Sequence, residues 1–257
     1  MILLFCARFV SRLIMTFNRI IYLIITFLSA NVIISQTSSN QPTSKRYNAA
    51  DIIDIDYGII MYNKLVPMMA GDSVRYTKEG VKAQNYQEDY YVSGKLLHKG
   101  FYADGAIKVF KNYYENGQLE RSFSSTDVKR GKLEIFYTDG TVKSTIDYYL
   151  GNPQNQYDFF KNGTPEYIEE NDKNIEYLYK RNSFFESGLP ASIFELVDKK
   201  SKTYIKKEYY ESGLLKEEGS MLFRKDLGDY QKEGNWTYYN EKGAIIKNEI
   251  FLKGEQQ

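Results

Sequence analysis

The chain has 257 residues, of which 42% are hydrophobic and 26% are charged, as is ordinary for a folded protein. Its formal net charge of +1 gives no argument for a nucleic-acid partner. The single cysteine is Cys6, so we expect neither a disulfide framework nor a cysteine metal site in the body of the protein.

Residues 1–35 are predicted to be a targeting segment. An uncharged apolar run over 20–28 follows Arg19, and its length suits a signal-peptide core better than a spanning helix of about 20 apolar residues. Cleavage after Ser35 and a true start at Met15 follow from this interpretation, and an uncleaved N-terminal anchor is the alternative. Cleavage would leave 31 basic and 33 acidic residues, a net charge of −2. We therefore expect an exported protein, whether periplasmic, cell-surface or secreted.

The next two segments lead into the body of the protein. Residues 36–50 are rich in Ser, Thr, Asn and Gln and are predicted to be a flexible linker. Residues 51–89 are less regular, although 59–62 has the composition of a buried strand. We expect 51–89 to be a cap with strands that shields the first edge of a repeat sheet.

From residue 90 to residue 257 the chain repeats one short pattern. Two aromatic residues are followed by two polar residues, a glycine and an aliphatic residue, most clearly over 113–119. An aromatic doublet places one ring on each face of a strand, and Asn116-Gly117 predicts a type I′ hairpin turn. The copies begin at Tyr90, Phe101, Tyr113, Phe136, Phe159, Phe184, Tyr209 and Tyr238, with a degenerate one at Tyr76. The last copy is interpreted as carrying one extra residue.

The turn glycines recur at a nearly fixed period, which is the signature of a repeat array. Steps of 23 residues lengthen later to 25 and 30, and insertions at 199–202 and 224–228 account for the difference. We predict that the structural turn glycines are Gly94, Gly105, Gly117, Gly140, Gly163, Gly188, Gly213 and Gly243. One unit of 23 residues holds two short strands and two turns. Residues 151–156 are predicted to be a loop.

One frame within the array resembles the MORN repeat in its bacterial variant form. Gly234–Tyr239 is the best match, with Trp236 in the tryptophan position, and Gly131–Tyr137 is a looser one with Leu133 in that place. The resemblance covers residues 71–257. It implies a repeat fold; some bacterial members are labelled antitoxin-like, and eukaryotic members act as interaction or membrane-apposition modules. It carries no functional residue over to this chain.

Successive hairpins are predicted to form an all-β fold, an elongated twisted antiparallel meander. About 16 strands spaced 4.8 Å apart would extend for about 75 Å. Such a sheet has little two-layer core, and aromatic contacts along its faces supply much of its stability.

The residue types give no sign of a reaction centre. The chain has no nucleophile elbow and no phosphate-binding glycine loop. His98, the only histidine, is predicted to be a surface strand residue. Asp51, Asp54 and Asp56 lack the spacing of a calcium loop and are predicted to lie on a solvated strand face. We expect a protein that is not an enzyme and has no catalytic residue, cofactor or metal.

The tyrosine rows either hold the sheet together or form a surface for a peptide or glycan. The candidate surface aromatics are Tyr114, Tyr137, Tyr210, Trp236 and Tyr239, although Trp236 is also predicted to pack against other rings. We expect an exported scaffold that binds a protein partner through its sheet. An antitoxin or immunity protein and a carbohydrate-binding module are the alternatives. Nucleic acid is not expected, and a membrane is expected only at an uncleaved N-terminal segment.

Overall fold

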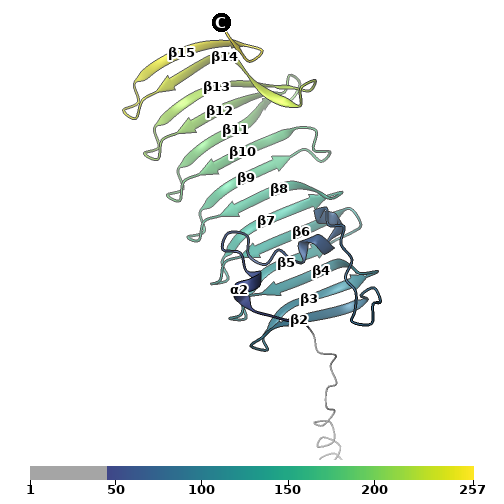
Figure 1. The fold of residues 1–257 in the computed structure, drawn as a ribbon. Helices are drawn as coiled ribbons and strands as arrows, with labels where there is room; N and C mark the ends of the chain where they lie inside the picture. The colour runs from purple at the N-terminus through teal and green to yellow at the C-terminus, as the bar shows by residue number, and fades with distance from the viewer. Residues whose placement is uncertain (1–44) are drawn as a thin grey trace, which may run out of the picture. The chain divides into compact units, whose positions relative to one another are not determined.

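The computed structural model describes residues 45–257, and the predicted signal peptide and most of the predicted linker lie outside them. These residues form one sheet of 16 strands whose spatial order follows the sequence (Figure 1). The first pair is parallel and the remaining pairs are antiparallel, as in the pairing of β2 with β3. The predicted all-β antiparallel meander is therefore confirmed. Within 45–257, no helix has the length and apolar character needed to cross a membrane.

The elements are short and closely spaced. The strands are β1 (Arg46–Tyr47), β2 (Asn85–Tyr91), β3 (Leu96–Ala103), β4 (Ala106–Tyr113), β5 (Leu119–Ser125), β6 (Arg130–Phe136), β7 (Val142–Tyr149), β8 (Asn152–Phe159), β9 (Pro165–Asn171), β10 (Leu178–Phe184), β11 (Pro190–Asp198), β12 (Thr203–Tyr209), β13 (Leu215–Arg224), β14 (Asp229–Tyr239), β15 (Ile245–Leu252) and β16 (Glu255–Gln256). The helical segments are α2 (Ala49–Ile52) and the 3-10 turns η2 (Asn63–Leu65) and η3 (Pro67–Met69). β1 lies within the last part of the predicted linker 36–50, and α2 begins in it and ends beyond it.

The turns on one side of the sheet, where the strands end, differ from those on the other side. All eight predicted turn glycines lie in turns with φ between 79° and 91°. In the turn at Gly117 its N–H donates to Tyr114 O at 2.8 Å, and Asn116 stays outside the left-handed region. This is a type I turn closed by a left-handed glycine, so the predicted type I′ turn is wrong here. The glycine corrects the strand twist that a type I turn alone would splay.

Type I′ geometry occurs in turns on the opposite side of the sheet, at the other ends of the strands. Both central residues have positive φ at Asp104-Gly105, and the same holds at Leu150-Gly151. β8 begins at Asn152, directly after the turn at Leu150-Gly151, so the predicted loop over 151–156 is wrong. Pro153 fits within β8 because it pairs with Tyr148 beside a register shift, where a missing N–H is tolerated. The predicted insertion at 199–202 lies in a turn, and that at 224–228 begins with the last residue of β13 and continues as a turn over 225–228.

The last repeat keeps the same turn as the others. Gly243 N donates to Asn240 O at 2.8 Å, and Asn240 N donates to Ala244 O at 2.9 Å. Tyr239 therefore takes the first aromatic position and Asn240 the second. The predicted extra residue is wrong because the aromatic doublet at 238–239 stands one position earlier than in the other copies.

Replacing Gly117 by alanine should lower the free energy of unfolding by about 1 kcal/mol. Nothing lies within 4 Å of the added Cβ, so the cost is that of holding φ at +91°. Urea unfolding followed by circular dichroism measures it. Glu115→Ala, in the same turn but without positive φ, is the matched control and should change little. Equal effects of the two substitutions would contradict the conformational explanation.

Residues 48–84, which we call the cap, fold over one face of β2–β6 (Figure 1). The cap buries Ile59, Tyr62, Leu65 and Val66 against apolar side chains of the sheet. The prediction that it shields the first sheet edge is therefore corrected: it covers a face, and only the two-residue β1 lies along that edge. Within the predicted buried strand 59–62, Ile59 and Tyr62 are buried and Ile60 is 50% exposed, and none of these residues forms a strand. The larger cluster of buried apolar side chains lies beneath this second layer, and a smaller cluster of Leu178, Phe194 and Tyr204 lies beyond it.

Candidate binding face

We call the side of the sheet that carries the cap the cap-bearing face. Directly paired residues of neighbouring strands share a face, so the register traces a row of side chains along it. This central row consists of Asp89, His98, Asn112, Arg121, Ile135, Ser144, Asp158, Tyr167, Ser183, Ser192, Glu208 and Glu217. It runs without a break from beneath the cap into the part of the face that the cap leaves open.

Beneath the cap, His98 is the centre of a hydrogen-bond chain. Its Nδ1 lies 2.7 Å from Asn112 Oδ1, and its Nε2 lies 2.9 Å from Tyr102 Oη. The Asn112 amide donates onward to the main chain of the cap, so Nδ1 is assigned as the donor and Nε2 as the acceptor. His98 is 0% exposed, and the prediction of a surface histidine is wrong. The cap that buries it comes from a distant, irregular segment.

His98 should make the protein less stable as the pH falls from 6.5 towards 4. Burial lowers the pKa of His98 to about 4. The unfolded chain therefore binds a proton that the folded chain does not, and about 3 kcal/mol is lost by the end of this window. Urea midpoints measured between pH 7 and pH 4.5 test this.

His98→Gln is the control for this prediction because the chain has no other histidine. The variant should be less stable at pH 7 and should lose the part of the pH dependence that His98 causes, while carboxylates such as Glu208, whose pKa is held below its usual value, still lower the stability as the pH approaches 4.5. A wild-type midpoint that stays constant from pH 6.5 to pH 4.5 would contradict the assignment of His98 as buried and neutral.

Two ion pairs lie between the cap and the sheet: Arg75–Asp89 joins the two, and Glu120–Arg121 lies within β5 and bonds to the main chain of the cap. Arg75 binds Asp89 through two nitrogens at 2.7 and 2.9 Å, and Tyr62 donates to the same carboxylate at 2.8 Å. Glu120 and Arg121 form a second pair, 0% and 1% exposed, with Nη2 to Oε1 at 2.7 Å. Adjacent charged residues in a strand normally face opposite sides, so their joint burial was not predictable from the sequence pattern.

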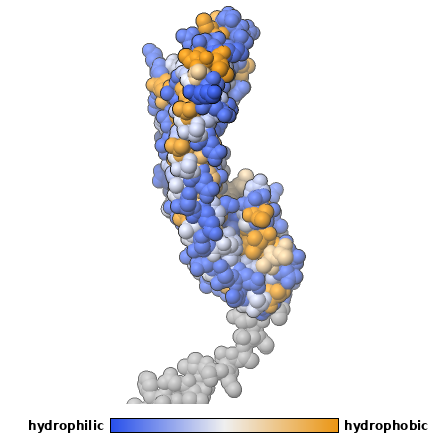
Figure 2. Space-filling view, turned by 90° about the vertical axis from the view of Figure 1, so that its left-hand side faces the viewer, coloured by the Kyte–Doolittle hydropathy of each residue, from blue (hydrophilic) through white to orange (hydrophobic). Residues whose placement is uncertain are grey.

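Beyond the cap, the same face is open. Figure 2 shows in profile that the cap projects from one side of the sheet and leaves the rest of that side uncovered. The open part holds a hollow of about 310 Å³, which we call the open hollow. It is lined by Tyr167, Arg181, Ser183, Ser192, Phe194, Lys206, Glu208, Met221 and Tyr230.

The walls of the open hollow combine rings, hydroxyls and paired charges. Phe194 stacks on the buried Tyr204 ring at 4.8 Å, and Tyr230 packs edge-on against both rings. Ser183 and Ser192 pair across β10 and β11, and within the described part of the chain neither hydroxyl makes a side-chain hydrogen bond. The site therefore offers an apolar wall beside two hydroxyls that are available to a ligand.

The charges at the open hollow are balanced. Arg181 binds Glu169 at 2.9 Å, and Lys206 binds Glu208 at 2.9 Å. Burial acts to raise the pKa of Glu208, but the hydrogen bond and charge of Lys206 outweigh it and hold that pKa below its usual value. Glu208 is thus a carboxylate acceptor at neutral pH. The pairing leaves little net charge to attract a highly charged ligand.

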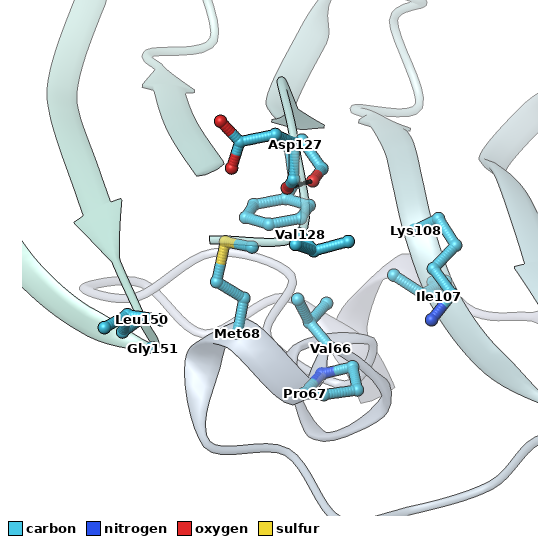
Figure 3. Close-up of a pocket in the computed structure, with 11 residues that line it drawn as sticks. Val66, Pro67, Met68, Ile107, Lys108, Asp127, Val128, Leu150 and Gly151 are labelled. Atoms are coloured by element: carbon cyan, nitrogen blue, oxygen red, sulfur yellow. Dashed lines mark hydrogen bonds between the residues drawn. The ribbon is translucent and has the colours of Figure 1, made fainter. Parts of the chain in front are cut away.

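A second, larger hollow of about 590 Å³ lies beside η3 (Figure 3). The cap contributes Val66, Pro67 and Met68, and the turns at the sheet edge contribute Val128 and Leu150. Its lining is mainly apolar. The Asp127 carboxylate at its rim accepts two main-chain N–H groups of its own loop, at 2.7 and 2.9 Å, and so holds that loop.

No metal site is visible within 45–257, where no group of three His, Cys, Asp or Glu side chains could hold an ion. Asp54 accepts the N–H groups of Asp56 and Tyr57, both at 2.9 Å, and so closes a turn. The predicted solvated strand face over 51–56 is therefore an exposed turn and a short helix.

Three of the predicted surface tyrosines tie one repeat to the next. The hydroxyl of Tyr114 donates to Phe136 O at 2.9 Å, that of Tyr137 to Phe159 O at 2.7 Å, and that of Tyr210 to Tyr239 O at 2.9 Å. Each bond joins the second aromatic of one copy to the first aromatic of the following copy. These half-buried rings therefore link successive repeats on the side of the sheet that carries the glycine turns.

The other two predicted aromatics differ from each other. Tyr239 is half-buried and donates to Glu218 at 2.9 Å. Trp236 is 0% exposed, which corrects its assignment as a surface residue, although it does pack against Phe251 and Tyr238 as predicted. Gly219 on the neighbouring strand leaves the space that the indole fills.

Comparison with known proteins gives no family: no protein-family model matches the chain, and no curated protein matches it. Sequence reasoning missed Ser183, Ser192 and Phe194 as residues of one site. Their only signal is the strand register, which brings Ser183 of β10 beside Ser192 of β11.

Proposed function

We propose that this protein is an exported, non-enzymatic repeat scaffold that binds a protein partner through the open part of its cap-bearing face. The observation that carries the proposal is the continuity of that face. Beneath the cap it already holds a polypeptide, and beyond the cap it offers an uncovered hollow with an apolar wall and available hydroxyls. Repeat arrays commonly bind partners through the extended surface that their repeats form.

Crosslinking of lysines in the protein's own cells tests the proposal. Lys206 and Lys247 lie on the cap-bearing face, whereas Lys99 and Lys207 lie on the opposite face. We expect the full chain to be crosslinked to one protein species, mainly through Lys206 and Lys247. A chain that gives only internal crosslinks would overturn the proposal.

Export is the part of the proposal that rests on the sequence of residues 1–35, with its apolar run after Arg19. Cell fractionation tests it independently of binding. Protein confined to the cytoplasm with residues 1–35 intact would remove export and leave the binding proposal standing.

A further inference from the structure

The cap shows how this face binds the main chain of an irregular segment that contains turns. Arg121 donates to Tyr57 O at 2.5 Å, and Asn112 donates to Ile59 O at 3.3 Å. Glu120 accepts from the N–H of Ile59 at 3.1 Å. The side chains of the sheet thus bind main-chain groups, which every polypeptide carries whatever its sequence.

One inserted ring accompanies these hydrogen bonds. Tyr62 of the cap stacks on His98 with ring centroids 3.7 Å apart and 8° between the planes. The ring of Tyr62 is almost fully buried by this contact and its neighbours. The cap is therefore held by a combination of main-chain hydrogen bonds and one aromatic anchor.

The open half of the central row has the same two components. Ser183, Ser192 and Glu208 continue the row and present donors and acceptors to solvent. Phe194 and Met221 lie in the same hollow and form a wall suited to an apolar side chain. The recognition chemistry found beneath the cap is thus continuous with that of the open hollow.

The charges restrict the class of occupant. Arg181 and Lys206 are each paired with a carboxylate on the same face. A polyanion would have to compete with these carboxylates for the two cations. A segment of low net charge meets no such penalty.

We propose that the open hollow binds a short polypeptide segment of a protein partner, which lies across β9–β13 as residues 57–62 lie across β3–β5. The segment places one apolar or aromatic side chain against Phe194 and Met221. Its main-chain groups bond to Ser183, Ser192 and Glu208. This inference rests on the proposed function and identifies the part of the partner that is recognised.

Site-specific photo-crosslinking of the full chain in its own cells tests the inference. A photo-reactive phenylalanine analogue is placed at position 183 in the open hollow or, as a control, at position 145 on the opposite face. Adducts are digested and sequenced by mass spectrometry. We expect an adduct at position 183, on a single short segment of one protein, and none at position 145.

Substitutions in the hollow complete the test. With the probe at position 183, Ser192→Arg should reduce the adduct yield by about tenfold because the new side chain fills the hollow. Thr145→Arg on the opposite face should leave the yield unchanged. Melting temperatures show whether each variant folds, and the smaller change Ser192→Gln serves if Ser192→Arg does not.

Several results would overturn the inference. They are a glycan adduct, an adduct spread over separate segments of a folded domain, or a yield that Ser192→Arg does not change. Lysine crosslinks to a partner without any adduct at position 183 would also overturn it and would leave the proposed function standing. The absence of both kinds of crosslink would remove the two together.

Discussion

Arg121→Met should destabilise the capped half of the protein by about 3–5 kcal/mol, because it leaves the Glu120 carboxylate buried without its cation. Glu120 is 0% exposed, and its remaining partner would be the N–H of Ile59. The main-chain oxygen of Tyr57 also loses its donor. The cap should therefore detach at a lower denaturant concentration than in the wild type.

Hydrogen exchange resolves where the stability is lost. We expect faster exchange in residues 57–75 and in β2–β6, with β11–β15 unchanged, since the stability of a repeat array is a sum of neighbouring contacts. Lys99→Met is the matched control: its partner Glu88 is a third exposed, and water can replace the lost interaction. Uniform faster exchange along the whole sheet would contradict a local role for the Glu120–Arg121 pair.

Trp236→Ala should cost about 3–5 kcal/mol in the C-terminal half, because the indole is wholly buried on a sheet that has no covering layer there. The ring is held by a hydrogen bond from Nε1 to Ser220 O at 3.1 Å and by Lys232 Nζ, 3.9 Å from the ring centroid. Urea unfolding and hydrogen exchange of β13–β15 measure the loss.

Gly219 provides a double-mutant test of this packing. A Cβ at Gly219 would lie 2.3 Å from the Trp236 ring, so Gly219→Ala alone should destabilise by about 1–3 kcal/mol. In the Trp236→Ala background the same methyl group meets empty space, and its cost should largely disappear. The fluorescence of Trp236, the only tryptophan, should shift to longer wavelength in Gly219→Ala. Additive costs would show that the glycine serves another purpose.

Local sequence was sufficient to predict the meander. A glycine in a left-handed turn and an aromatic doublet in the adjoining strand are requirements of a few neighbouring residues, so their repetition can be read directly. The type of each turn was harder to predict from the sequence than its position. The turn at Gly117 is type I where type I′ was predicted, because a polar-glycine pair suits both turns and loop length decides between them.

The site could not be predicted in the same way. His98 was predicted to be a surface strand residue, and Trp236 was a candidate surface aromatic that was also predicted to pack against other rings; both are buried. His98 is buried by the cap. Trp236 is buried because its own indole packs against Gly219 on the neighbouring strand. The local sequence around His98 does not predict that the cap will pack on it, and that around Trp236 does not predict the contact with Gly219.

The sequence by itself determined that this protein is a ribbon of hairpins, because turns and strand faces depend on residues close together in the chain. Only the tertiary structure decided which part of one face is covered and which is open. That choice depends on contacts such as Ile59 with Glu120, which join residues 61 positions apart. Strand register likewise gathers Tyr167, Ser192 and Glu208 into one hollow, and no local pattern encodes their meeting.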